Sequence, residues 1–315
     1  MFTVETSFKR VQSLTFSADG RLAVLSKGNA WECEVWSLPP DPETVWRERD
    51  DEPFAFGLAF DPRTGHLMHG DSGDGLIASE PSSAGAVGWE VPGGPLRVFA
   101  ISPSGDRIVC GCEFVDGRLP NRGVDAQLVS FTRGGKQKHW TRSAVLESDG
   151  FGVTDLAFFP NGKRFASIEW SKRKVRKYYL PGDSPTLRVH DAKSLDELDA
   201  TTFKQPASAL VVCGNKVVVR GEKSFRVWDG DDLSTAPTEV KTGKAPGAAV
   251  VADPQGRFVL TATSNAVSVW DANSWSATKT YEWASGKISC LAVSPDGLLA
   301  AAGTATGKVI VWDVE

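Results

Sequence analysis

The stretch that decides the fold is ISCLAVSPDGLLAAAGTATGKVIVWDVE, residues 288–315. It contains three short apolar runs separated by two turns, and the third run ends in Val-Trp-Asp. Runs this short, rich in Val, Ala and Leu and bounded by Gly and Pro, are typical of strands rather than helices. In the turn Ser-Pro-Asp-Gly, proline presets φ for a type I turn, and Gly297 takes the left-handed position that follows. The stretch therefore predicts a short strand meander.

The same pattern recurs upstream, in residues 247–274 and 207–232. The Trp-Asp pairs of the three copies begin at Trp228, Trp270 and Trp312, at a constant spacing of 42 residues. Weaker copies are marked by a glycine in the turn between their first two strands. These glycines identify seven copies: Gly20, Gly65, Gly105, Gly162, Gly214, Gly256 and Gly297. A unit of about 40–45 residues with four strands and a Trp-Asp end is the sequence signature of a propeller blade.

These repeats resemble those of the WD40-repeat family, and the resemblance covers essentially the whole chain. It implies an all-β, seven-bladed β-propeller in a single domain, residues 1–315. The blade-packing residues are expected to be Trp36, Trp228, Trp270 and Trp312. The expected blades span residues 11–50, 54–91, 95–144, 151–203, 207–243, 247–283 and 287–315, the last with residues 2–8.

The chain departs from the family pattern before the first strand of each blade. Family blades usually carry a Gly-His there, whose histidine links a Ser or Thr and an Asp to the tryptophan. None of the 4 histidines lies at that position. Cohesion is therefore expected mainly from strand ladders and apolar packing between blades.

The last repeat ends on the third strand of a blade, so its fourth strand must come from elsewhere. The segment FTVETSF, residues 2–8, alternates apolar and polar residues, which is typical of a strand. We expect it to pair with the final VIVWD strand. Such pairing closes the ring and removes an open sheet edge.

Composition limits the cell compartment and the kind of partner. The net charge of −4 and sequence pI near 5.7 argue against nucleic-acid binding over the whole surface. No window approaches 18 uninterrupted apolar residues, so no membrane span is expected. Five cysteines without a framework spacing, and no signal-peptide pattern, predict a cytoplasmic protein. The oligomeric state is left open.

Basic residues are predicted to gather on one side of the disc, which we call the top face, and the acidic residues Asp50, Asp51 and Glu52 are expected on the same side. It carries the connections between blades and the turns between the second and third strands of each blade, and it includes Lys9 and Arg10. Two blades are enlarged there, by loops at residues 113–125 and 170–185. The candidate partner-binding residues are Lys172, Arg173, Lys174, Arg176, Lys177, Tyr178, Tyr179, Lys204, Lys244 and Lys287.

Lysine and arginine supply charge and donors for carboxylate or phosphate, and tyrosines add flat contact area. The alternative for the charge run at 172–177 is a solvated excursion anchored by its two tyrosines. The opposite side, the bottom face, carries the turns between first and second strands and many aspartates, such as Asp229, Asp253, Asp271 and Asp296.

No metal or cofactor site is predicted. Cys110 and Cys112 are too few ligands for zinc and are interpreted as small buried hydrophobes. His66 and His69 have the wrong spacing for ligation from one face of a strand. The segment HGDSGDG, residues 69–75, lacks the distal Glu of an EF-hand loop and precedes a strand, so it is predicted to be neither a calcium loop nor a phosphate loop.

The predicted function is a non-catalytic scaffold that binds a protein or peptide partner, with an acidic segment favoured. One alternative is a propeller enzyme, a hydrolase or isomerase, that uses the central channel. Only Asp155 is a charged residue expected within an innermost strand, and one carboxylate is not a catalytic site, so no catalytic residue is assigned. The other alternative is a structural subunit of a larger assembly that uses its acidic side.

Overall fold

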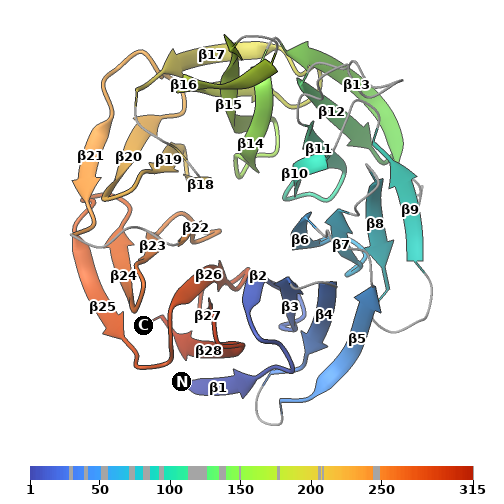
Figure 1. Cartoon of the computed structure of the whole chain (residues 1–315), viewed down its shortest axis with the longest axis vertical. Coiled ribbons are helices and arrows are strands. Elements are labelled where there is room, and N and C mark those ends of the chain that lie inside the picture. Colours follow the sequence, from blue (N-terminus) through green and yellow to red (C-terminus); the bar gives the residue numbers. More distant parts are fainter. Residues whose placement is uncertain are drawn as a thin grey trace.

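The computed structural model describes residues 1–27, 31–38, 42–50, 56–70, 75–80, 86–91, 96–112, 126–134, 140–148, 150–175, 178–204, 207, 209–243 and 249–314. Its strands form seven four-stranded antiparallel sheets arranged in a ring (Figure 1). In each sheet one edge strand lies nearest the axis of the ring and the other edge strand lies at its periphery (Figure 1). The molecule is an all-β, seven-bladed β-propeller, as the sequence predicts.

The blades follow one another along the chain. Blade one is β2 (Val11–Phe16), β3 (Leu22–Lys27), β4 (Trp31–Trp36) and β5 (Thr44–Asp50). Blade two is β6 (Phe56–Phe60), β7 (Leu67–Gly70), β8 (Gly75–Ser79) and β9 (Ala86–Glu90). Blade three is β10 (Leu96–Ile101), β11 (Arg107–Cys112), β12 (Ala126–Thr132) and β13 (Thr141–Ser148). Blade four is β14 (Gly150–Phe158), β15 (Arg164–Val175), β16 (Tyr178–Asp191) and β17 (Glu197–Thr202).

The remaining three blades continue in chain order, except that the last takes its fourth strand from residues 2–5. Blade five is β18 (Ala209–Cys213), β19 (Lys216–Arg220), β20 (Ser224–Asp229) and β21 (Thr238–Lys241). Blade six is β22 (Ala249–Ala252), β23 (Phe258–Ala262), β24 (Ala266–Asp271) and β25 (Ala277–Glu282). Blade seven is β26 (Ile288–Val293), β27 (Leu299–Thr304), β28 (Lys308–Asp313) and β1 (Phe2–Glu5).

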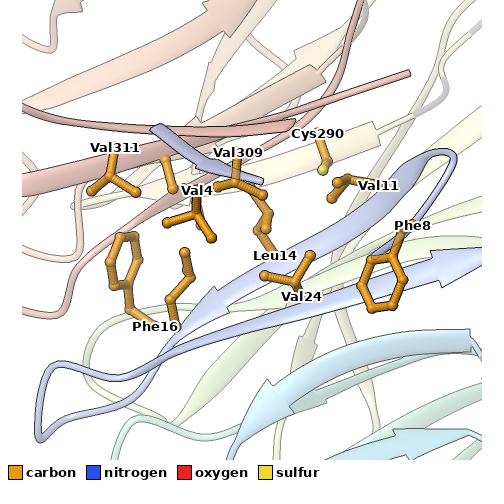
Figure 2. Packing of buried hydrophobic residues seen from close by; sticks show 12 residues of the cluster. Val4, Phe8, Val11, Leu14, Phe16, Val24, Cys290, Val309 and Val311 are labelled. Atoms are coloured by element: carbon orange, nitrogen blue, oxygen red, sulfur yellow. The ribbon is translucent and has the colours of Figure 1, made fainter. Parts of the chain in front are cut away.

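The predicted closing strand is confirmed. β1 pairs antiparallel with β28, so that Phe2 lies opposite Val311 and Val4 opposite Val309. The side chain of Val4 is buried in a cluster with Phe8, and this cluster joins blade seven to blade one (Figure 2). An early segment of the chain thus supplies the fourth strand of a blade whose other three strands come from its late segments.

The turns between first and second strands have the predicted backbone conformation. All seven marker glycines have positive φ, from 59° at Gly214 to 85° at Gly20. A residue with a side chain would be strained in this left-handed region. At Gly105 space is limiting as well, because a β-carbon there would lie 2.6 Å from Cγ of Arg63 in the neighbouring blade.

The hydrophobic core is divided into layers between neighbouring blades. One layer joins Leu260 and Val269 of blade six to Ile310 and Trp312 of blade seven. Trp228 and Trp270 are likewise buried, and Trp36 is half-buried. Part of the buried polar chain of the family persists without its Gly-His, because Nε1 of Trp270 donates to Oγ1 of Thr261 at 2.8 Å.

The enlargement of blade four differs from the expectation of a loop. β15 and β16 continue past the body of the blade as a two-stranded ribbon, residues 172–175 and 178–181, with Lys172 opposite Pro181 and Val175 opposite Tyr178. Backbone pairing across the hairpin makes this segment regular. The enlargement of blade three, residues 113–125, lies outside the described residues.

Candidate functional site

Backbone hydrogen bonds define the two faces of the disc. On the top face, the amide of Ile288, in the connection to blade seven, donates to the carbonyl of Ser264 at 2.8 Å. Ser264 lies in the turn between the second and third strands of blade six. On the bottom face, the amide of Ala272 donates to the carbonyl of Arg257 at 3.0 Å, which joins the segment after a third strand to a turn between first and second strands. The connections between blades and the turns between first and second strands therefore lie on opposite faces, as the strand order predicts.

Aspartates of the bottom face are occupied by the fold itself. Asp191 and Asp271, which directly end the third strands of blades four and six, each bind backbone amides of the following turn. The amides are those of Ser194, at 2.9 Å, and Ser274, at 2.8 Å. These hydrogen bonds lower the pKa of both carboxyls. The carboxylates therefore stabilise turns.

Other bottom-face carboxylates are paired with basic side chains. Oδ2 of Asp229 lies 2.8 Å from Nζ of Lys216, and Oδ2 of Asp253 lies 2.7 Å from Nε of Arg257. The hydrogen bond from Lys216 is the main cause that lowers the pKa of Asp229. Much of the negative charge on this side is thus compensated internally.

Basic residues of the top face have a different environment. Lys9, Arg10, Lys204 and Lys287 are exposed, and none of them forms an ion pair with any residue that the structure describes. In contrast, Lys308 pairs with Glu5 at 3.0 Å across the closing strands. The charged groups of these four side chains are thus exposed and have no ion-pair partner among the described residues.

The blade-four ribbon lies on the same face, because it extends a turn between second and third strands. At its base Trp170 pairs with Pro185 and Lys172 with Pro181, so one residue of β15 opposes three of β16. A β-carbon on Gly182 would lie 2.1 Å from Oγ of Ser171 and 3.2 Å from its carbonyl oxygen, so the two strands are closely packed at this bulge. The bulge separates the ribbon from the body of the blade.

The predicted partner-binding residues are distributed around the ring rather than gathered at one point. Lys172, Arg173, Lys174, Tyr178 and Tyr179 have a described backbone within the ribbon, and their side chains are outside the description. Arg176, Lys177 and Lys244 lie outside the described residues altogether.

Two predicted lysines border cavities. Lys204 lines a cavity of about 340 Å³ between blades four and five, together with Arg226 and Trp228. Lys287 lines one of about 250 Å³ together with Arg10 and Ser289. The sequence identifies the cations, but the cavities depend on contacts between blades that no local pattern reveals.

Asp155 has a structural role near the axis. Its two carboxylate oxygens accept hydrogen bonds from the amides of Leu156, at 2.9 Å, and Leu210, at 2.7 Å. The second bond joins the innermost strands of blades four and five. Burial raises the pKa of Asp155 to about 6, against the hydrogen bonds and the charge of Arg220, which lower it.

Blade four contains a buried Ser-His-Glu group. Oγ of Ser167 lies 3.1 Å from Nε2 of His190 and 3.2 Å from Oε1 of Glu169. Nδ1 of His190 faces the carbonyl of Leu195 at 3.1 Å, so Glu169 does not orient the imidazole as a catalytic triad requires. All three side chains are buried, and His190 stacks on Phe165, which makes the group part of the blade's packing.

The residues considered for metal binding are distributed through the core. Cys110 and Cys112 are buried free thiols, and His69 is fully buried. Within the described part of the chain, no group of three or more His, Cys, Asp or Glu residues has an arrangement that could hold a metal ion. A search of the same residues finds no helix with the length and hydropathy of a membrane span.

Comparison with known families agrees with this architecture. The family model for the WD domain, G-beta repeat (WD40), matches residues 275–313. The match runs from β25, the outermost strand of blade six, through the first three strands of blade seven. A search of curated proteins found no match to the chain.

The fold and this match define the class of protein: a seven-bladed β-propeller with a WD40 repeat. Propellers of this class generally mediate protein interactions and are typically non-enzymatic scaffolds.

Proposed function

We propose that the protein is a non-catalytic interaction scaffold whose top face binds an acidic segment of a partner protein. The observation that carries this proposal is a set of exposed top-face cations that have no ion-pair partner among the described residues. Bottom-face carboxylates have partners within the fold, such as Lys216 for Asp229. The cations at Lys9, Arg10, Lys204 and Lys287 form no ion pair with a described residue. Exposed cations without an ion-pair partner among the described residues favour the approach of a segment of opposite charge.

The blade-four ribbon extends this surface beyond the body of the blade. Its backbone pairs only across its own hairpin among the described residues, and it carries Lys172, Arg173 and Lys174 in succession. Lysine on a free strand edge prevents pairing between copies of the protein while it leaves the edge open to an acidic chain. We therefore assign the first encounter with the partner to the ribbon.

The test is affinity capture of partners from the source cell with a charge-reversed ribbon. Lys172→Glu/Arg173→Glu/Lys174→Glu is expected to lower partner recovery by about tenfold or more, because each reversal replaces attraction with repulsion. The matched control is Lys163→Glu/Lys193→Glu, which reverses exposed lysines of the bottom face. Recovery that is equal for the ribbon variant and the unmodified protein would contradict the proposal.

A further inference from the structure

The segment between β1 and β2 is held in place on the top face. The amide and the hydroxyl of Thr6 both donate to the carbonyl of Gly307, at 3.2 and 2.6 Å. Further along, the carbonyl of Val11 accepts a hydrogen bond from Oγ of Ser289 at 2.5 Å. The backbone that carries Arg10 is therefore fixed next to β26, the innermost strand of blade seven.

A cavity of about 250 Å³ lies at this junction of blades one and seven. Arg10 borders it from the blade-one side and Lys287 from the blade-seven side. Ser289 and Ala305 also line it, and their small side chains leave the space free. Pockets for whole small molecules are typically about 300–1,000 Å³, so this cavity suits one chemical group of a larger ligand.

The electrostatics of the cavity are dominated by its two cations. Neither Arg10 nor Lys287 forms an ion pair with a described residue. The hydroxyl of Ser289 already donates to the carbonyls of Val11 and Gly303. The charge of Arg10 also reaches β26, where it opposes the effect of burial on the pKa of the Cys290 thiol. The group that such a site accepts carries negative charge and several acceptor oxygens.

We propose that this cavity is an oxyanion site, in which Arg10 and Lys287 together bind one carboxylate or phosphate group of the partner's acidic segment. The inference rests on the proposed function and assigns it an anchor point. Arginine binds an oxyanion through two parallel N–H groups, and lysine adds a point charge from the other side. Charge-assisted hydrogen bonds of this kind are stronger than neutral ones.

Binding at this place also acts on the closure of the ring. Arg10 follows β1, and Lys287 directly precedes β26. A bound oxyanion therefore connects the closing segment to the blade that β1 completes. A ligand that binds only the closed form stabilises that form by mass action. The backbone amides of β1 are then expected to exchange more slowly with solvent when the site is occupied.

The test uses the full chain and three fluorescent peptides of identical Gly-Ser framework. Their centre is a Glu pair, a phosphoserine or a Gln pair, and binding is measured by anisotropy at physiological salt. The two acidic peptides are expected to bind and the Gln peptide is not. Arg10→Met and Lys287→Met should each weaken binding by about tenfold or more, the value of a lost charge-assisted hydrogen bond.

Lys163→Met is the control, because Lys163 is an exposed lysine of the bottom face that does not line the cavity. Its effect is expected to stay within about twofold, since a surface charge in water contributes little. Hydrogen exchange of β1 in the presence of the bound peptide should slow in the unmodified protein and not in Arg10→Met. The tighter of the two acidic peptides identifies the source of the oxyanion as carboxylate or phosphate.

Two outcomes overturn the inference: no binding of either acidic peptide, or equal weakening by Lys163→Met and Arg10→Met. The proposed function is judged separately by partner capture. If the captured partner is lost on ribbon reversal but not with Arg10→Met and Lys287→Met, the oxyanion site is wrong and the scaffold function stands. If the peptides bind through Arg10 and Lys287 but ribbon reversal leaves partner recovery unchanged, the site stands and the proposed function is wrong.

Discussion

Two tryptophans at equivalent positions have different hydrogen bonding. Nε1 of Trp270 donates to Thr261, whereas Nε1 of Trp312 is buried and has no partner among the described residues. The strand registers place Ala302 in blade seven where blade six has Thr261. The sequence predicts both tryptophans, but the lost acceptor becomes visible only when the registers of the two blades are compared.

Ala302→Ser is expected to raise the free energy of unfolding by about 1 kcal/mol, because its hydroxyl would accept a hydrogen bond from the buried indole. Denaturant unfolding measures the gain. The control is the same substitution in a Trp312→Phe background, where no donor exists and no gain is expected. An equal gain in both backgrounds would show that the hydrogen bond is not the cause.

The carboxyl of Asp155 predicts a pH dependence of stability. Its pKa is raised from the usual 3.8 to about 6, so between these values the folded protein retains a proton that the unfolded chain releases. Stability from this group is complete below about pH 3.8 and decreases as the pH rises to about 6. Asp155→Asn lacks this ionisation. The unfolding free energy of Asp155→Asn minus that of the unmodified protein should therefore increase from pH 4 to pH 7; a constant difference would contradict this assignment.

At the scale of elements, the sequence predicts the hairpin turns within blades better than the two-stranded ribbon of blade four. Proline and glycine fix a hairpin turn locally, and all seven marker glycines have the expected positive φ. The ribbon of blade four was wrongly expected to be a loop. A run of lysines and arginines has no apolar period, and its strand conformation depends on pairing with residues 178–181.

Replacing residues 172–181 with an Asn-Gly turn tests the independence of the ribbon. The melting temperature should change by less than about 2 °C, because the ribbon pairs only with itself among the described residues. Partner recovery should fall as it does for the charge-reversed ribbon. Thermal unfolding and affinity capture are the two measurements, and a variant that loses stability would show that the ribbon supports the ring.

A buried ion pair connects blades two and three. Asp61, which follows β6, binds Arg133, which follows β12, through two contacts of 2.6 and 2.8 Å. Both side chains are almost fully buried, at 2% and 4% exposure, and Arg133 also donates to the carbonyl of Gly105. The partners are far apart in the sequence, so no local pattern predicts the pair.

Arg133→Met should lower the free energy of unfolding by about 3–5 kcal/mol, because it leaves the carboxylate of Asp61 buried without its partner. The double variant Asp61→Leu/Arg133→Met removes both charges and should recover most of that loss. Denaturant unfolding of the three proteins measures the difference. A double variant as unstable as the single one would show that packing, rather than the unpaired charge, is the cause.

At the scale of the whole molecule, ring closure was predicted from the alternation of residues 2–8 and depends on β1. Alternation identifies the strand and its buried side, since Val4 is buried and Thr3 is exposed. The positions of the cavities were not predictable, because each lies where two blades meet and depends on the shape of both. The strands of each blade can thus be predicted from the sequence, whereas the cavities between blades cannot.

Val4→Asp is expected to lower the melting temperature by several degrees, because it places a charge within the layer that joins blade seven to blade one. Thr3→Asp is the matched control in the same strand, and its exposed side chain should tolerate the change. Differential scanning calorimetry compares them. Equal melting temperatures for the two variants would mean that β1 does not hold the ring closed.

The pairing of β1 with β28 also determines the order of assembly. Six blades consist of strands that are consecutive in the chain and can form as the polypeptide emerges from the ribosome. The seventh blade forms only when β1 pairs with β28, the last strand to be synthesised. This pairing closes the largest loop in the molecule. Until then the nascent protein has an exposed β28 edge, so completion of the circle is the step at which a chaperone would be of most use.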